Sequence, residues 1–203
     1  MISDAGENSQ KVRCFIGIAA SDVGLEDGLV QQMALYRQRP GWEALRWTPA
    51  HFLHLTLAFL GNQAFSTLQA LQKTLSACLQ QQSPFALQVT RCSSFPDASS
   101  GIVAALADLS PDLVALQQCA VKAVQQAGIA TETRPYRPHI TLARVSKNAT
   151  VYHVDEPLML QGKVQAVSLY RSELLPEGSH YTVMARYPLG FAGMPTGAAE
   201  LSG

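Results

Sequence analysis

The 203-residue sequence has no excess of charge of either sign, since Lys and Arg number 15 and Asp and Glu also number 15. A protein that binds long nucleic acid needs a basic side chain for each phosphate that it neutralises, so this balance disfavours that class. Charged residues make up only 15% of the chain and apolar residues 47%, which excludes a disordered chain. The composition predicts a folded domain with a substantial buried core.

Long apolar runs and several signature motifs are also missing. No run approaches the roughly 20 apolar residues that span a bilayer, and the polar start, MISDAGENSQK, lacks the pattern of a secretion signal. We therefore expect a cytoplasmic protein with no membrane attachment. The sequence has no P-loop, dinucleotide-binding glycine motif, serine-hydrolase elbow or zincin motif. Acidic residues do not cluster with histidine, which disfavours a two-metal phosphodiesterase.

Cysteine is scarce and scattered. The four residues, Cys14, Cys78, Cys92 and Cys119, form no closely spaced pair. This spacing predicts four buried thiols in a reducing compartment rather than a metal site or a disulfide framework.

Hydrophobic periodicity predicts a mixture of strands and helices. Strands are expected at 14–20, within 48–61, and at 85–95, 102–107, 139–145, 163–170 and 180–187. Helices are expected over 25–36 and 65–79, and from Pro111, which follows a Ser110 N-cap, to the turn before Gly128. The mixture predicts an α+β fold in one domain over 12–187, with a flexible N-terminus at 1–11 and a flexible tail at 188–203.

The most informative pattern is an internal repeat. HLTLAFLG at 54–61 and HITLARVS at 139–146 share His, Thr, Leu and Ala at the same offsets. Alternate side chains of a strand share a face, so we expect His54, Thr56 and Ala58 on one face and Leu57 and Phe59 on the core face. His139, Thr141 and Ala143 would follow the same rule in the second copy.

Each copy places an imidazole and a hydroxyl about 7 Å apart along one strand face. Two such strands could surround one phosphoryl group and supply both a proton acceptor and a proton donor. A single His-x-Thr is more often an ordinary half-buried strand, but β-propensity does not select histidine twice before the same Thr-Leu-Ala. The repeat therefore predicts an acid/base site formed by His54 and His139.

Basic and aromatic residues near the second copy are further candidates for substrate binding. Arg134, Arg137, Arg144 and Lys147 carry four positive charges without an acid between them, although a charge run often only faces water. Strict alternation would send Arg144 to the core face, so either the core ends there or the strand twists. Phe15 and Tyr136 are candidate base-stacking platforms, with burial in the core as the alternative. His51, His153 and His180 have no Thr partner and are expected to be structural or exposed.

With these motifs, the sequence resembles the two-histidine phosphoesterase superfamily, and within it the RNA 2′,3′-cyclic phosphodiesterases, also called 2′-5′ RNA ligases. The resemblance lies in RCFIGI at 13–18, HLTLAFLG at 54–61 and RPYRPHITLAR at 134–144. It implies a bilobal α+β fold. Two pseudo-symmetric lobes, each with an antiparallel sheet and helices, would place one motif each in a central cleft.

The resemblance also implies an activity, the opening of a terminal 2′,3′-cyclic phosphate of RNA to a 2′-phosphomonoester. In this activity His54 gives a proton to the leaving 3′ oxygen, His139 activates water, and Thr56 and Thr141 hold the phosphate. The resemblance implies that the activity needs no metal and no nucleotide cofactor. It also implies that the protein is a monomer whose partners are RNA ends, such as those of tRNA halves. The reverse reaction, ATP-independent 2′-5′ ligation, is implied as well.

Two other functions stay open from the sequence. One is a related phosphodiesterase that acts on 2′-5′ linkages, small cyclic nucleotides or ADP-ribose cyclic phosphate. The other is a noncatalytic module that binds RNA ends, which two intact His-x-Thr copies argue against. The local sequence also leaves open which histidine is the acid.

Zero net charge predicts few contacts with RNA phosphates and therefore a shallow salt dependence of RNA binding.

Overall fold

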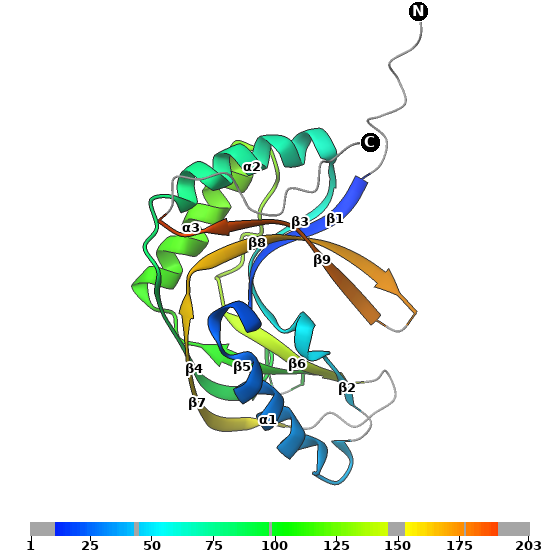
Figure 1. Ribbon diagram of the computed structural model, residues 1–203. Coiled ribbons are helices and arrows are strands. Elements are labelled where there is room, and N and C mark those ends of the chain that lie inside the picture. The colour runs from blue at the N-terminus through cyan, green and yellow to red at the C-terminus, as the bar shows by residue number, and fades with distance from the viewer. Residues whose placement is uncertain (1–10, 43–44, 98, 146–152, 177, 191–203) are drawn as a thin grey trace, which may run out of the picture.

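The strands form a single curled antiparallel sheet (Figure 1). The computed structural model describes residues 11–42, 45–97, 99–145, 153–176 and 178–190. Within them the strands are β1 (Lys11–Ala19), β2 (Leu45–Trp47), β3 (His54–Ala64), β4 (Phe85–Ser94), β5 (Ile102–Ala107), β6 (His139–Val145), β7 (Asp155–Val164), β8 (Ala166–Leu175) and β9 (Gly178–Pro188). The order across the sheet is β7-β4-β5-β6-β3-β1-β8-β9, and β2 pairs with β6.

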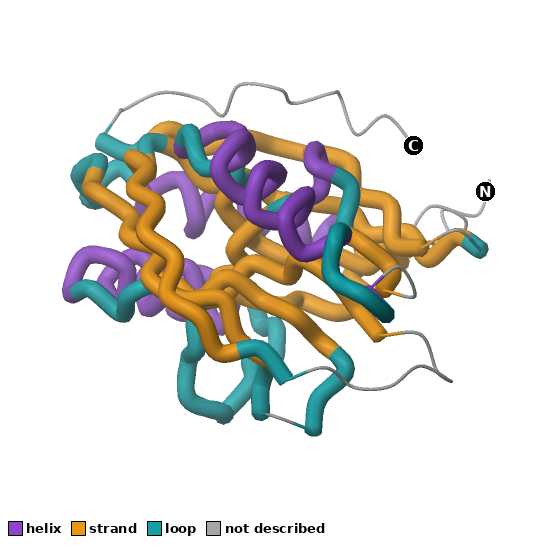
Figure 2. Tube along the Cα trace, turned by 90° about the horizontal axis from the view of Figure 1, so that it is seen from below, coloured by secondary structure: helices purple, strands orange, loops and turns teal. Residues whose placement is uncertain are grey.

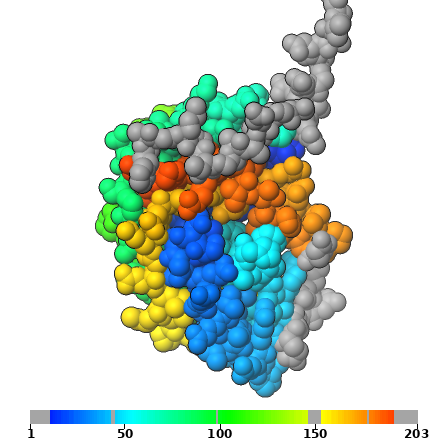
Figure 3. Space-filling model, in the orientation of Figure 1, coloured from blue at the N-terminus to red at the C-terminus, as the bar shows by residue number. Residues whose placement is uncertain are grey.

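Helices lie on both sides of the strands (Figure 2). They are α1 (Glu26–Arg37), α2 (Phe65–Leu79) and α3 (Pro111–Gln126), with the short 3-10 helices η1 (Ser21–Val23) and η3 (Ala50–Phe52). Gly28 of α1 lies so close to β7 that a Cβ added there would sit 2.6 Å from a Leu160 methyl carbon. Figure 3 shows α1 in blue beside the yellow residues of β7. None of the described helices is long and apolar enough to cross a membrane.

The start of α3 has the predicted capping signals. The Ser110 side chain accepts a hydrogen bond from the Leu113 backbone N–H at 3.2 Å, and Pro111 is the first helical residue. Gly128 follows the helix with φ of 75°, a left-handed conformation that glycine adopts without strain. Buried Leu residues of α2 and α3 then fix the pair of helices against the sheet.

The sheet has a narrow seam at its centre. β3 and β6 are joined through one residue pair, Leu55 with Ile140. These two residues hold the same position in the two repeated motifs, so the motifs meet in an antiparallel arrangement with approximate twofold symmetry. The α+β class with antiparallel strands is confirmed. Where one sheet per lobe was expected, the two halves, β3-β1-β8-β9 and β6-β5-β4-β7, are continuous across this seam.

The first motif contains a β-bulge. Gly17 of β1 pairs with Thr56, and the next pair along the strands is Ile16 with Ala58. Leu57 is therefore an extra residue on β3 with no partner on β1. A bulge of this kind adds one residue to a strand and changes the phase of its alternation.

The second motif contains the same bulge at the same position. Ala104 of β5 pairs with Thr141, and the next pair is Val103 with Ala143, which leaves Leu142 as the extra residue on β6. The repeat therefore extends from the sequence to the backbone geometry. Beyond each bulge the side chains alternate in the opposite phase to the residues before it.

This change of phase corrects the expected faces of both strands. Phe59 was expected in the core, but it is 50% exposed, whereas Ala58 is buried. Arg144 is the equivalent residue of the second motif and is also exposed, while Ala143 is buried. The bulge therefore brings one large side chain per motif to the face that carries the histidines.

Several expected element boundaries were wrong. The strand expected within 48–61, with the sequence FLHLTLAFL, begins only at His54, because Ala50–Phe52 form a helical turn after Pro49. The strand expected at 163–170 is divided at Gln165 between β7 and β8. Leu189, expected in a flexible tail, is buried, so the packed chain extends past residue 187.

The cysteines also differ from expectation. Cys14 and Cys92 are free and buried, as predicted. Cys78 of α2 and Cys119 of α3 are joined as a disulfide, with Cα atoms 5.9 Å apart. The two helices pack against each other, which brings together residues separated by 41 positions, and sequence spacing alone does not show such proximity.

Candidate active site

The seam places the four residues of the two His-x-Thr motifs side by side. Because Leu55 faces Ile140 on antiparallel strands, the register sets His54 beside Thr141 and Thr56 beside His139. All four side chains are partly exposed on the same face, while Leu55 and Ile140 between them are buried on the opposite face. We call these four residues the seam site. The sequence predicted each of them, and the structure brings them together.

Both histidines are held by the same backbone contact. Nδ1 of His54 lies 2.7 Å from the carbonyl oxygen of Phe52, and Nδ1 of His139 lies 2.9 Å from that of Arg137. A carbonyl oxygen can only accept, so each Nδ1 carries a proton and donates it. Each Nε2 is then the nitrogen that can accept or give a proton in chemistry. The contact thus fixes both the tautomer and the ring orientation.

An aromatic ring also supports each imidazole. The rings of Phe15 and His54 have centroids 4.6 Å apart, and those of Phe95 and His139 are stacked at 3.8 Å. Phe15 is only 3% exposed and stacks on Tyr170 behind it, so of the two alternatives left open by the sequence it takes burial in the core, where it forms a wall for His54. Sequence reasoning missed Phe95, whose only signal was its place between a strand and a proline.

The surroundings lower the pKa of both histidines. Burial is the largest cause for each, because it disfavours the imidazolium form. The positive charge of Arg144 lowers the pKa of both His54 and His139, that of Arg137 lowers the pKa of His139, and a charge on His139 lowers that of His54. The hydrogen bonds to the backbone carbonyls act in the opposite direction. Both rings are therefore biased towards the neutral form.

Arg144 is the charged side chain that the bulge at Leu142 turns to the seam site. It is exposed, and its charge acts on both histidines. The sequence left two explanations open for the position of Arg144, an end to the core or a twist of the strand, and neither of them is the cause. The extra residue in β6 shifts the phase, and the guanidinium reaches the face of His139 and Thr141.

A cavity of about 520 Å³ opens beside Thr56 and His139, and we call it the large cavity. Its walls are mostly apolar and include Phe59, Phe95 and Tyr136. The Tyr136 hydroxyl donates a hydrogen bond to the backbone carbonyl of Thr56 at 3.2 Å, which ties the 130s segment to β3. Burial raises the pKa of Tyr136, so its hydroxyl stays protonated and can serve as this donor.

The other predicted basic residues differ in their surroundings. Arg134 lines the large cavity, but its side chain is 81% exposed and forms an ion pair with Glu132 at 3.0 Å. Arg137 also lines this cavity, with its guanidinium 4.7 Å from the centre of the Phe95 ring. Lys147 lies outside the described residues. His51, His153 and His180 are exposed, in agreement with the sequence prediction.

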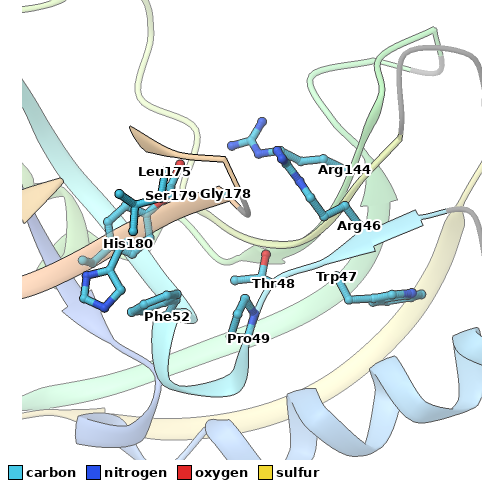
Figure 4. A pocket seen from close by; sticks show the side chains of 11 residues that line it. Arg46, Trp47, Thr48, Pro49, Phe52, Arg144, Leu175, Gly178, Ser179 and His180 are labelled. Atoms are coloured by element: carbon cyan, nitrogen blue, oxygen red, sulfur yellow. The ribbon is translucent and has the colours of Figure 1, made fainter. Parts of the chain in front are cut away.

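A second cavity, of about 160 Å³, contains Arg144, and we call it the small cavity (Figure 4). It is lined by residues of β2, β6, η3 with the loop before it, and the β8-β9 hairpin: Arg46, Trp47, Thr48, Pro49, Phe52, Arg144, Leu175, Gly178, Ser179, His180 and Tyr181. Tyr181 also contacts the His54 ring edge-on at 4.9 Å. The small cavity thus adjoins the His54 side of the seam site. Among the described residues, no three His, Cys, Asp or Glu side chains gather as metal ligands.

The fold and the seam site together define a two-histidine phosphoesterase, in which two symmetric strands each present one His-x-Thr motif. A family model described as the 2′-5′ RNA ligase superfamily matches residues 30–174. The chain belongs to this superfamily, which confirms the resemblance stated from the motifs.

Relatives of known sequence carry a consistent name. An RNA 2′,3′-cyclic phosphodiesterase of Thermus thermophilus is 29% identical over 168 residues, which cover 79% of this chain and 82% of the relative. An RNA 2′,3′-cyclic phosphodiesterase of Methanothermobacter thermautotrophicus is 27% identical over 187 residues, covering 88% of this chain and 100% of the relative.

Solved structures show the same fold. The crystal structure of the Thermus thermophilus protein TT0787 has a TM-score of 0.76 at 26% identity and covers 89% of this chain and 100% of its own. E. coli LigT complexed with 3′-AMP has a TM-score of 0.72 at 25% identity and covers 90% of this chain and 100% of its own.

The electrostatics of the seam site give the first testable prediction. Replacing Arg144 by Gln removes a positive charge that acts on both imidazoles, so the pKa of His54 and the pKa of His139 should both rise. Arg137→Gln is the matched control and should raise the pKa of His139 only, since its backbone carbonyl is retained. NMR titration of the imidazole protons measures these shifts. Unchanged or lowered pKa values in Arg144→Gln would contradict the placement of Arg144.

Proposed function

We propose that this protein hydrolyses the 2′,3′-cyclic phosphate at the end of an RNA to a 2′-phosphomonoester, with His54 and His139 as the acid/base pair. The observation that carries the proposal is the paired Nδ1 contact to the carbonyls of Phe52 and Arg137. It leaves two Nε2 atoms, one per motif, to exchange protons at a phosphate between them. The names of the relatives, RNA 2′,3′-cyclic phosphodiesterases, support this substrate class.

The reaction needs two proton transfers, and each histidine performs one. The Nε2 of neutral His139 takes a proton from water as the water oxygen forms a bond to phosphorus. The bond from phosphorus to the 3′ oxygen breaks, and the imidazolium of His54 gives its proton to that oxygen. The product is a 2′-phosphomonoester with a free 3′ hydroxyl, and the proton moves have exchanged the states of the two rings. This assignment of roles rests on the resemblance to the family.

The pKa directions suit this division. In the free protein both rings are biased to the neutral form, which provides the base. The cyclic phosphate is an anion, and its arrival favours a proton on one ring, which provides the acid. At neutral pH one ring can thus be a neutral imidazole while the other is an imidazolium. No metal is needed to activate water in this scheme, and we propose that the reaction proceeds without one.

Thr56, Thr141 and Arg144 are proposed to hold the nonbridging phosphate oxygens. In the seam register each threonine is beside the histidine of the other motif, which supports this role for its hydroxyl. The Arg144 guanidinium supplies a charged donor that can compensate the negative charge that develops during attack. The large cavity, with Phe59, Phe95 and Tyr136 in its walls, has the size and apolar character to hold the terminal nucleoside. We further propose that 2′-5′ ligation occurs as the reverse reaction.

Loss of either histidine should abolish most of the activity. His54→Gln and His139→Gln should each lower kcat/KM for an RNA with a 2′,3′-cyclic phosphate end by about 10²- to 10⁴-fold, the usual contribution of general acid/base catalysis. His153→Gln, at an exposed histidine outside both cavities, is the matched control and should keep normal turnover. Circular dichroism verifies that each variant is folded. Near-normal turnover in both seam variants would refute the proposal.

The separate roles are tested with a substrate that has sulfur in place of the 3′ oxygen. A thiolate leaves without a proton at neutral pH far more readily than an alkoxide, because a thiol has a pKa of about 8.5. The defect of His54→Gln relative to wild type should therefore shrink on this substrate, while the defect of His139→Gln persists. Steady-state release of thiol measures both. Recovery of His139→Gln instead of His54→Gln would show that the roles are reversed.

A further inference from the structure

Two arginines with no described acidic partner meet in the small cavity. Arg46 of β2 is directly opposite Arg144 of β6 in the antiparallel register. Both are exposed, and Figure 4 shows that the two side chains extend in the same direction, towards the β8-β9 hairpin. Like charges opposite each other across two strands destabilise a sheet. In the described part of the chain neither arginine forms an ion pair, so nothing there offsets this repulsion.

The remaining walls of the small cavity carry aromatic rings. The Phe52 ring meets the His180 ring edge-on at 5.0 Å and the Tyr181 ring at 5.2 Å. Phe52 also supplies the carbonyl that holds His54. A pair of arginines is a combination that binds a phosphate group of a nucleic acid. The small cavity therefore has phosphate-binding chemistry adjacent to the seam site.

The two cavities differ enough in size to take different parts of an RNA end. A cavity of about 150 Å³ binds benzene, so the small cavity, at about 160 Å³, has the size for a phosphate group rather than for a nucleoside. The large cavity, at about 520 Å³, is within the range of sites that enclose drug-sized ligands. The seam site lies between them: His139 lines the large cavity, and His54 contacts the ring of Tyr181, which lines the small cavity.

We propose that the small cavity is a second phosphate subsite, in which Arg46 binds the phosphodiester that precedes the terminal nucleoside of the RNA, while Arg144 beside it holds the cyclic phosphate. This inference rests on the proposed function and narrows its substrate class. The protein acts on the end of an oligonucleotide in preference to a mononucleoside cyclic phosphate. One additional phosphate contact is also compatible with a chain of zero net charge, which cannot neutralise a long RNA.

The test pairs one change in the protein with one change in the substrate. The substrates are the dinucleotide ApA with a 2′,3′-cyclic phosphate end and the same molecule with a neutral methylphosphonate in place of its internal phosphodiester. Wild type should prefer the charged dinucleotide by about tenfold in kcat/KM, the effect of one charge-assisted hydrogen bond. Arg46→Gln should lose most of this preference. The preference comes from the pairing of the Arg46 guanidinium with the internal phosphodiester, and either change removes that pairing.

The matched control is Lys73→Gln. It removes the same unit of charge from the exposed face of α2, which contributes no residue to either cavity. This variant should keep the wild-type preference, which separates a local contact from the overall charge of the protein. Equal rates for the two dinucleotides in wild type, or an unchanged preference in Arg46→Gln, would overturn the subsite.

Failure of the proposed function would give a different result. In that case wild type would hydrolyse neither dinucleotide, and calorimetry would then compare binding of ApA 2′-phosphate with binding of its methylphosphonate analogue. Tighter binding of the charged molecule to wild type but not to Arg46→Gln would support the subsite even without turnover. Equal binding of the two molecules to wild type would overturn it.

Discussion

The candidate active site depends on one contact in the sheet, the pairing of Leu55 with Ile140 across the seam. This pair buries two apolar side chains on the core face and so fixes which residues face the other way. Because the strands are antiparallel and the motifs are equivalent, the same register brings both histidines and both threonines together. A shift of one residue would turn all four towards the core. The register of the seam is thus both a packing constraint and the basis of the proposed catalysis.

Approximate symmetry at the seam is combined with asymmetry around it. Both motifs have a bulge at the same leucine, and both histidines donate Nδ1–H to a carbonyl two residues earlier. Beyond the bulges, however, the first motif presents Phe59 to the large cavity and the second presents Arg144 to the small one. A phosphate between the histidines therefore meets an apolar wall on one side and a cationic wall on the other. We infer that this asymmetry orients the substrate and so gives the two equivalent imidazoles different tasks.

The sequence predicted the residues of the site better than their surroundings. The repeated His-x-Thr motif could be recognised in the sequence because the proposed acid/base chemistry needs particular residue types. Strand β6 and the Ser110 cap could be predicted from local signals. The bulges were not predictable, since no glycine or proline marks Leu57 or Leu142, and so Phe59 was assigned to the wrong face. Phe95 and Arg46 were missed because their importance comes from distant strands that meet only in the folded sheet. The Cys78 to Cys119 disulfide depends in the same way on helix packing.

The central claim is that the two histidines alone carry out proton transfer at a cyclic phosphate whose 3′ bond breaks. The most direct measurement is ³¹P NMR of the reaction of wild-type protein with an RNA that ends in a 2′,3′-cyclic phosphate, in an excess of EDTA. The account predicts that the cyclic phosphate signal is replaced by the signal of a 2′-phosphomonoester at a rate that the chelator does not change. A 3′-phosphomonoester product, or activity that disappears with EDTA, would contradict it.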